Sequence, residues 1–164
     1  MRKQSFPPVA DKNARFLILG SIPGERSLAE QQYYAHPQNL FWVFMDELLG
    51  IDRTQPYPER LLQLKQHHIA LWDVLRECER QGSLDQHIRN EQPNDFVKFL
   101  RAHPHIQRIG FNGRKARDVF MKQVERVHPE CVEGIERVLL PSTSPAHAGK
   151  SKALKKREWQ AFLG

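Results

Sequence analysis

The sequence predicts an α/β fold: a three-layer sandwich with a central, mostly parallel four-stranded sheet. Two patterns lead to this prediction. Apolar runs of strand length alternate with stretches of helical periodicity along nearly the whole chain. The apolar runs are also continuous, which indicates strands buried on both faces, as in parallel sheets. A chain of 164 residues suits one domain, residues 1–164, with a core of ordinary size.

Each predicted element begins and ends at recognisable residues. Gly20, the pair Asn112–Gly113 and Pro141 each end an apolar run, whereas the segment after residue 75 is charged and reaches a turn near residue 82. The predicted strands are residues 15–20, 68–75, 106–111 and 136–140. The predicted helices are residues 40–49, 58–66, a helix through residues 96–100 with Asn94 as its N-cap, 114–127, and a basic helix over 151–162.

The loops that follow the strands are expected to form one composite site. Right-handed crossovers bring the carboxyl ends of parallel strands to one edge of the sheet. Ligands bind at that edge in open α/β sheets. The segments concerned are residues 21–39, 72–73, 112–113 and 141–147, and residues 21–39 are expected to be a polar loop.

The charge balance favours a polyanionic partner. The net charge is +6 and the isoelectric point is about 9.5. A basic domain of this kind attracts nucleic acid, although solvated helix faces without such a partner are the alternative. The cations gather in two clusters: Arg114, Lys115 and Arg117, and Lys150, Lys152, Lys155, Lys156 and Arg157.

Composition also predicts several absences. No apolar run approaches the ~18 residues of a membrane span, and the first ten residues lack the apolar segment of a secretion signal. Cys78 and Cys131 lie far apart, and no histidine pair has a metal-binding spacing. We therefore expect a cytoplasmic, nucleoid-associated monomer with no membrane partner, no metal and no cofactor.

The loop after the first strand carries the first unusual motif. It reads GSIPGERS over residues 20–27, and its glycines would expose backbone N–H groups to a phosphate. It lacks the Lys-Ser/Thr pair of a Walker A loop and the third glycine of a dinucleotide fingerprint. Because its glycines still suit a phosphate, a small-molecule phosphohydrolase is kept as an alternative function, although both of these motifs are absent.

Two motifs together resemble the uracil-DNA glycosylase superfamily. GxxPGxxS at residue 20 and AHPxNxFW at residues 35–42 are similar to its motif 1, above all in the mismatch-specific uracil/thymine branch. LPSTSPAHA at residues 140–148 resembles motif 2, in the version of the hypoxanthine-DNA glycosylase branch. The segments 69–75 and 108–116 fall where that branch has its middle strands, so the resemblance covers about residues 16–148.

The resemblance implies a glycosylase fold and a reaction. The implied enzyme is a monofunctional DNA glycosylase of base-excision repair. It hydrolyses the N-glycosidic bond of a deaminated base, hypoxanthine or uracil, flipped out of DNA. The mismatch branch holds its water with an asparagine where this chain has Ile22. The hypoxanthine branch lacks that asparagine too, which implies Asn39 as the catalytic polar group, with Ser21 as a weaker candidate.

Each of these assignments has an alternative. Asn39 is also a natural N-cap for the helix at residue 40. Because Ile22 cannot orient water, a non-catalytic protein that binds lesions is the competing function. His147 stands where motif 2 commonly has asparagine, and it is a candidate for stabilising the leaving base.

Base recognition is expected from four residues. Tyr34 stands where the mismatch branch has a stacking aromatic. Ile22, earlier in the same loop, is the second candidate for contact with the base. Asp73 follows a strand, and an ionised carboxylate accepts the ring N–H that hypoxanthine and uracil share. Asn112 is the candidate donor to the base carbonyl. A helix cap for Asp73 and a turn for Asn112 are the alternatives.

The DNA backbone is expected to contact small and basic residues. Pro145 and Ala146 are small and rigid enough to enter a gap in the strand. Contacts to phosphates are independent of sequence and sensitive to salt. The candidates are Gly24, Ser27, Ser142, Ser144, Lys150 and Lys152.

Overall fold

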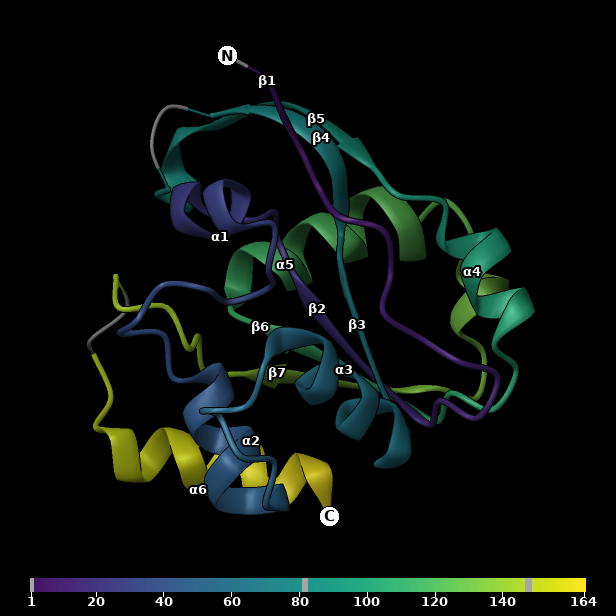
Figure 1. The fold of residues 1–164 in the computed structure, drawn as a ribbon. Helices are drawn as coiled ribbons and strands as arrows, with labels where there is room; N and C mark the ends of the chain where they lie inside the picture. Colours follow the sequence, from purple (N-terminus) through teal and green to yellow (C-terminus); the bar gives the residue numbers. More distant parts are fainter. Residues whose placement is uncertain (1, 81–82, 147–148) are drawn as a thin grey trace.

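The computed structural model describes residues 2–80, 83–146 and 149–164. A parallel sheet lies at its centre, with strand order β3-β2-β6-β7 (Figure 1). The prediction of a parallel four-stranded sheet is therefore confirmed. The strands are β2 (Phe16–Gly20), β3 (Ile69–Asp73), β6 (Arg108–Asn112) and β7 (Glu136–Leu140).

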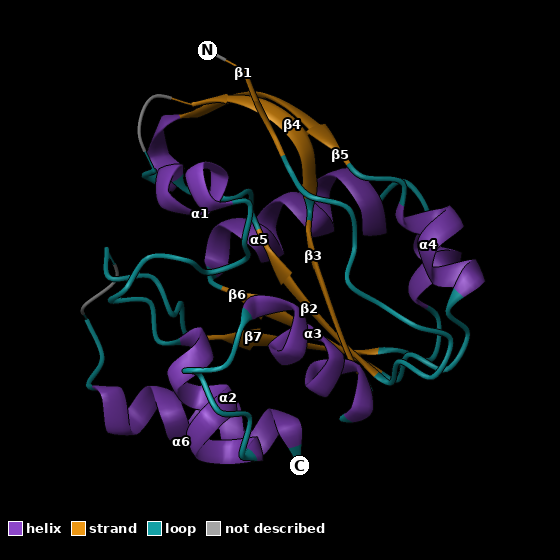
Figure 2. Ribbon diagram, viewed as in Figure 1, coloured by secondary structure: helices purple, strands orange, loops and turns teal. Residues whose placement is uncertain are grey.

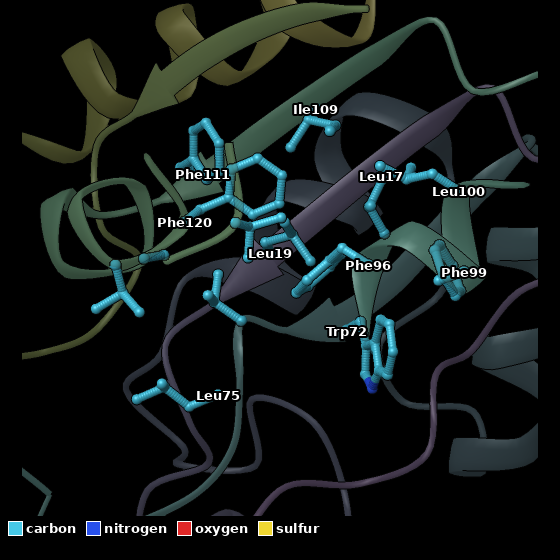
Figure 3. Packing of buried hydrophobic residues seen from close by; sticks show 14 of the residues in the cluster. Leu17, Leu19, Trp72, Leu75, Phe96, Phe99, Leu100, Ile109, Phe111 and Phe120 are labelled. Atoms are coloured by element: carbon cyan, nitrogen blue, oxygen red, sulfur yellow. The ribbon is translucent and has the colours of Figure 1, made fainter. Parts of the chain in front are cut away.

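Both faces of this sheet are covered by helices. In β2, Leu17 and Leu19 join one buried cluster while Ile18 joins the other, because successive side chains of a strand point to opposite faces. The first cluster packs under α4 (Phe96–Ala102) and α5 (Arg114–Phe120) and is rich in aromatic rings (Figure 3). The second packs under α2 (Phe41–Leu49), α3 (Tyr57–Gln66) and α6 (Lys152–Leu163). The three predicted layers are confirmed.

The register of the sheet places four strand ends side by side. Gly20 pairs with Asp73, and Asn112 pairs with Leu140. The carboxyl ends of all four strands therefore meet at one edge, as right-handed crossovers require.

Helix ends agree with the sequence in two places and differ in one. Gly50 ends α2 with a left-handed φ of 74°, and the Ser151 hydroxyl caps α6 by accepting from Leu154 N–H. The prediction that Asn94 caps α4 is wrong. Asp95 is the cap and accepts from Lys98 N–H, whereas the Asn94 side chain donates through its amide nitrogen to the Asp73 carbonyl at 2.8 Å.

The helix predicted over 114–127 is α-helical only in its first part. It continues from α5 as a π-helical segment, η2 (Met121–Glu125). A short helix, η3 (Pro129–Val132), follows it before β7.

A second, antiparallel sheet includes the charged segment after residue 75, where no strand was predicted; residues 81 and 82 of the predicted turn lie outside the described residues. β1 (Arg2–Gln4), β4 (Leu75–Arg80) and β5 (Ile88–Pro93) pair in the order β1-β4-β5. The strand predicted over 68–75 is interrupted at Val74, which separates β3 from β4. The hairpin of β4 and β5 arches above α1 (Glu25–Glu30) in the view of Figure 2. Helix α1 itself lies in a segment predicted to be loop.

Two features are absent from the described ranges 2–80, 83–146 and 149–164: a membrane-spanning helix and a cluster of metal ligands. None of their helices combines the length and hydrophobicity needed to cross a membrane. No group of three or more side chains of His, Cys, Asp or Glu comes together there in a way that suits a metal ion.

Candidate active site

A pocket of about 640 Å³ opens at the carboxyl edge of the central sheet. Its size suits a small organic ligand such as a nucleobase with its sugar. Its walls come from the loop after β2, the segment before α2, the ends of β3 and β6, the loop after β7 and the tip of the β4–β5 hairpin. Among the predicted site residues, those that line it are Ser21, Ile22, Gly24, Ser27, Tyr34, Asn39, Asp73, Asn112, Ser142 and Ser144.

Asn39 is half-buried and held in a fixed orientation. Its side-chain oxygen accepts from Phe41 N–H at 2.9 Å, and its backbone N–H donates to the His36 carbonyl at 2.9 Å. The N-cap of α2 is Leu40, so Asn39 stands one residue before the cap position foreseen as the alternative, and its bond to Phe41 N–H supports the start of the helix. Asn39 also lines the pocket. The amide oxygen has a second lone pair and the amide nitrogen two protons, so this bond leaves it able to bind a water or substrate.

Asn112 is fixed by two hydrogen bonds to one residue. Its amide nitrogen donates to Thr143 Oγ1 at 2.9 Å, and its oxygen accepts from Thr143 N–H at 2.9 Å. The Thr143 carbonyl in turn accepts from Leu40 N–H at 3.0 Å. Thr143, which is only 1% exposed, thus joins β6, the loop after β7 and the start of α2. Sequence reasoning missed it, although an inward residue between Ser142 and Ser144 follows the alternation of an extended segment.

Two side chains of helix α6 hold the loop after β7 in place by hydrogen bonds to its backbone. Lys155 Nζ donates to the Ser142 carbonyl at 2.9 Å, and Trp159 Nε1 donates to the Pro141 carbonyl at 3.0 Å. Lys155 is only 5% exposed, and this burial lowers the pKa of its ammonium group. Lys155 was grouped with the cations that favour a polyanionic partner, but its charge is used inside the protein.

The two serines of this loop shape it through their hydroxyl oxygens. Ser142 Oγ accepts from Ser144 N–H at 3.2 Å, and Ser144 Oγ accepts from Ala146 N–H at 3.3 Å. In both cases the oxygen is the acceptor, so each hydroxyl proton can still be donated to an anion. His147, the candidate at the end of this motif, lies outside the described residues.

Asp73 carries a buried carboxylate at the end of β3. It is 3% exposed, and burial raises its pKa to about 7; Arg80 opposes the rise and Asp85 adds to it. Its Oδ2 is buried without a hydrogen-bond partner among the described residues. No helix begins at Asp73, since β4 follows Val74, so the alternative of a helix cap is wrong.

The Asp73 side chain requires a glycine beside it. A Cβ at Gly20 would lie 2.7 Å from Asp73 Oδ1 and 3.2 Å from the Tyr34 hydroxyl oxygen. The glycine that opens the first motif is therefore needed for close approach rather than for a phosphate.

Tyr34 lies next to this carboxylate in a strained conformation. Its ring stacks on Phe41 with 4.3 Å between centroids, and its backbone φ is +56°. Such a φ is rare for a bulky residue and is found where function requires it. Its hydroxyl oxygen is buried and forms no hydrogen bond of normal geometry among the described residues. Burial followed by the Asp73 charge raises its pKa, and the nearby Asn112 amide opposes the rise. Unpaired buried polar atoms of this kind mark a site that a ligand completes.

The β4–β5 hairpin supplies a wall that sequence reasoning missed. Arg80 is 3% exposed; its guanidinium donates to the Pro23 carbonyl and lies 3.8 Å from Asp85 Oδ1. Asp85 Oδ1 accepts from the Ser21 hydroxyl at 2.8 Å. Burial lowers the pKa of Arg80, and its Nε has no partner among the described residues. These contacts tie the hairpin to the first motif loop.

The remaining residues of the first loop have mainly structural contacts. Ile22 is 6% exposed and belongs to the core under α4 and α5. Gly24 precedes α1, and a Cβ there would lie 3.2 Å from Ser83 Oγ. Ser27 is buried, and its hydroxyl accepts from Ala35 N–H at 3.0 Å. Ser27 therefore closes the loop from inside.

Lys150 and Lys152 do not line the pocket. Their side chains are 51% and 52% exposed, and they pair with Glu158 at 2.7 Å and Glu47 at 3.1 Å. Exposed ion pairs of this kind are weak, so a phosphate can replace the carboxylates.

The family model for the uracil DNA glycosylase superfamily matches residues 7–163. The chain belongs to the uracil-DNA glycosylase superfamily. The resemblance noted from its two motifs is therefore confirmed, and so is the glycosylase-like fold. As a member of this superfamily the chain is a DNA glycosylase.

Relatives and solved structures agree with this membership. A hypoxanthine DNA glycosylase of Methanosarcina barkeri (strain Fusaro / DSM 804) is 37% identical over 163 residues, which cover 99% of each chain. One from Methanosarcina acetivorans is 37% identical over 166 residues, with the same coverage. An NMR structure from Methanosarcina acetivorans, described as a candidate uracil DNA glycosylase, is 38% identical. It has a TM-score of 0.84 and covers 99% of this chain and 97% of that one.

Proposed function

We propose that this chain hydrolyses the N-glycosidic bond of deoxyinosine in DNA and releases hypoxanthine, with uracil as the second candidate base. The observation that carries the proposal is the meeting of two groups in one pocket: the Asn39 amide and the buried, unpartnered Asp73 oxygen. The two Methanosarcina relatives named as hypoxanthine DNA glycosylases, similar over their full length, support the choice of base.

Asp73 selects the base by accepting a hydrogen bond. Hypoxanthine and uracil both present a ring N–H beside a carbonyl, and an ionised carboxylate only accepts. Adenine presents an unprotonated ring nitrogen at the same place, so it is repelled. Tyr34 lines the pocket beside Asp73 and offers an aromatic face for the flipped base.

Asn112 has a narrower role in this proposal. Its oxygen and one amide proton are bonded to Thr143. The second amide proton is the donor for the base carbonyl, and Thr143 fixes its direction. Ile22 contributes an apolar surface to the same pocket.

The chemistry needs one water and no covalent intermediate. The water oxygen attacks C1′ of the sugar, and the C1′–N bond breaks. Its electron pair leaves with the base, which takes up a proton, and an abasic sugar remains. Because Ile22 cannot bind the water, Asn39 orients it through the free lone pair of its amide oxygen. The Ser21 hydroxyl donates to Asp85 and has a supporting role.

No lysine occurs among the described residues that line the pocket, which supports direct hydrolysis over a lysine imine. His147 is proposed to stabilise the leaving base. Ser142, Ser144 and the backbone of Gly24 are proposed to contact phosphates, with Lys150 and Lys152 further out and Ser27 holding the loop. Because one chain supplies the residues that line the pocket, a monomer is the proposed form, and the proposed place of action is the nucleoid, where its DNA substrate lies.

The test is a panel of oligonucleotides that contain deoxyinosine, deoxyuridine, thymine or xanthine in single and double strands. Alkaline cleavage reports abasic sites. We expect deoxyinosine to give abasic product fastest. Binding to all of these oligonucleotides with no abasic product overturns the proposal in favour of a lesion-binding protein. Salt-insensitive activity on free nucleotides without DNA binding favours a phosphohydrolase.

A further inference from the structure

The segment that carries Asn39 is held by a continuous set of backbone hydrogen bonds. It belongs to no helix or strand, since α2 begins two residues later. The backbone N–H groups of residues 38–41 nevertheless all have partners. Gln38 N–H donates to His36 Nδ1 at 3.1 Å, and Asn39 N–H donates to the His36 carbonyl at 2.9 Å. The next two N–H groups donate to the Thr143 carbonyl at 3.0 Å and to Asn39 Oδ1 at 2.9 Å.

His36 supplies two of these four acceptors. Its carbonyl closes a β-turn over residues 36–39, and Pro37 stands at the second position of this turn, where its fixed φ is favourable. In the commonest β-turn, Asp, Asn or Ser is favoured at the first position, because an Asp or Asn side chain there accepts from the backbone N–H two residues on. In this chain the imidazole Nδ1 of His36 takes that acceptor role.

This contact fixes the tautomer of the His36 ring. A ring nitrogen that accepts from an N–H carries no proton, so the neutral ring has its proton on Nε2. His36 is exposed and lines the pocket together with Asn39. Its ring forms no other hydrogen bond within the described ranges, so its printed side-chain contact is to the backbone of the turn.

The direction of the Asn39 amide depends on this turn. One lone pair of Asn39 Oδ1 is used by Phe41 N–H, and the other is the proposed acceptor for the attacking water. At a reacting centre a shift of about 1 Å can cost about 10²-fold in rate. Without the bond to His36 Nδ1, Gln38 loses the anchor of its N–H directly before Asn39. The backbone that aims the amide is then less restricted.

We propose that His36 is a positioning residue that holds the turn carrying Asn39 through its Nδ1 acceptor. The proposal rests on the proposed function, in which Asn39 orients the water. It has a specific consequence: the acceptor at this position matters, and the imidazole itself does not. Asparagine, whose side-chain oxygen also accepts from the N–H two residues on, should replace the histidine. Phenylalanine, which keeps a ring but offers no acceptor, should not.

The first test compares His36→Phe and His36→Asn with the unaltered protein in single-turnover cleavage of deoxyinosine at saturating DNA. We expect His36→Phe to be about three- to tenfold slower, the factor that one net hydrogen bond supplies. His36→Asn should stay within about twofold. Affinity for an oligonucleotide with non-hydrolysable 2′-fluoro-deoxyinosine should not change in either variant. His105→Phe, at an exposed histidine before β6, is the matched control.

A double variant separates positioning from direct contact with DNA. If His36 acts through Asn39, His36→Phe should cause no further loss in a chain that already carries Asn39→Ala. A ring that itself binds the base or the DNA backbone would cause the same loss in both backgrounds, and that result would overturn the positioning role.

A measurement without DNA tests the turn itself. Hydrogen exchange of the Gln38 amide, followed by NMR, should be faster in His36→Phe than in the unaltered protein and unchanged in His36→Asn. If the unaltered protein releases no base, the proposed function fails, and the exchange of Gln38 still decides whether His36 anchors the turn. Equal exchange in all three proteins would overturn the inference.

Two results with an active unaltered protein would also overturn it. The first is an unchanged cleavage rate in His36→Phe, which would leave the turn without effect on Asn39. The second is a loss in His36→Asn as large as in His36→Phe, which would make the imidazole itself the required group.

Discussion

The two walls of the pocket are built in different ways. The sheet-edge wall consists of residues that follow the parallel strands and the start of α2: Asn39, Asp73, Asn112 and Thr143. The hairpin wall consists of Arg80, Ser83, Leu84 and Asp85. On the sheet-edge wall, hydrogen bonds of 2.9 Å fix Asn39 and Asn112, which keep unused lone pairs or protons, and one oxygen of Asp73 has no partner among the described residues. On the hairpin wall, the polar groups are used to bind the first motif loop, and an apolar side chain is left at the rim.

This difference indicates a division of labour. A reacting bond needs preorganised polar groups, which a rigid sheet edge provides. The hairpin wall instead holds the first motif loop in place through Arg80 and Asp85. Substitutions in the sheet-edge wall should therefore lower base release on every DNA substrate.

The largest effect is expected for Asn39→Ala. Removal of one preorganised polar group from a reacting centre typically costs about 10²–10³-fold in rate. Loss of the hydrogen bond from Phe41 N–H at the start of α2 costs only about 1 kcal/mol of unfolding free energy, so the variant stays folded. Single-turnover cleavage with thermal unfolding in parallel checks both expectations. Gln38→Ala, an exposed neighbour, is the control, and an unchanged rate in Asn39→Ala removes Asn39 from its role.

Asp73→Asn should lower the rate on deoxyinosine by about one to two orders of magnitude, since an amide replaces a charged acceptor in the buried site. Activity of the unaltered protein should rise as pH increases through about 7, where the carboxylate ionises. The variant should lose this dependence. A rate profile from pH 5.5 to about 8.5 tests it, because ionised Asp73 is the form that accepts the ring N–H. Asp118→Asn, on an exposed carboxylate, is the control.

The same pKa sets the sign of a stability effect. With a pKa of about 7 in the fold and about 3.9 in the unfolded chain, Asp73 binds more proton in the fold between these values. Stability from this group is therefore greatest below pH 4 and falls as pH rises towards 7. In Asp73→Asn this fall should be absent from thermal unfolding curves. An equal pH dependence in both proteins would contradict the buried carboxylate.

The smallest effect is expected for Lys150 and Lys152, which lie outside both walls of the pocket. Lys150→Ala and Lys152→Ala should each weaken DNA binding a few-fold and lower the salt slope of log K by about 0.9 per lost phosphate contact. Catalysis at saturating DNA should not change. Lys12→Ala, which precedes β2 at the other edge of the sheet, is the matched control. A salt slope that does not differ from that of the control removes these lysines from the DNA contact.

The sheet-edge wall could be predicted from the sequence, and the hairpin wall could not. Continuous apolar runs predicted the four central strands, and strand order then brought Asp73 and Asn112 together with the motif loops. In β4 the inward positions include Arg80, so the segment has no apolar alternation and its sequence predicts no strand. A buried arginine is exceptional, and only its contacts with Pro23 and Asp85 explain it.

One missed residue did leave a signal. Lys155, Trp159 and Phe162 follow helical spacing, so the lysine shares the buried face of α6 with two aromatic residues. Its cationic neighbours led to its grouping with the exposed lysines. The spacing of the aromatic residues was the better guide to where its charge lies.

The most direct test of the proposed site measures Asn39→Ala and the control Gln38→Ala side by side on deoxyinosine in duplex and in single-stranded DNA. We predict that Asn39→Ala loses base release on both substrates to the same extent, whereas Gln38→Ala keeps it. Equal rates of the two variants would contradict the account.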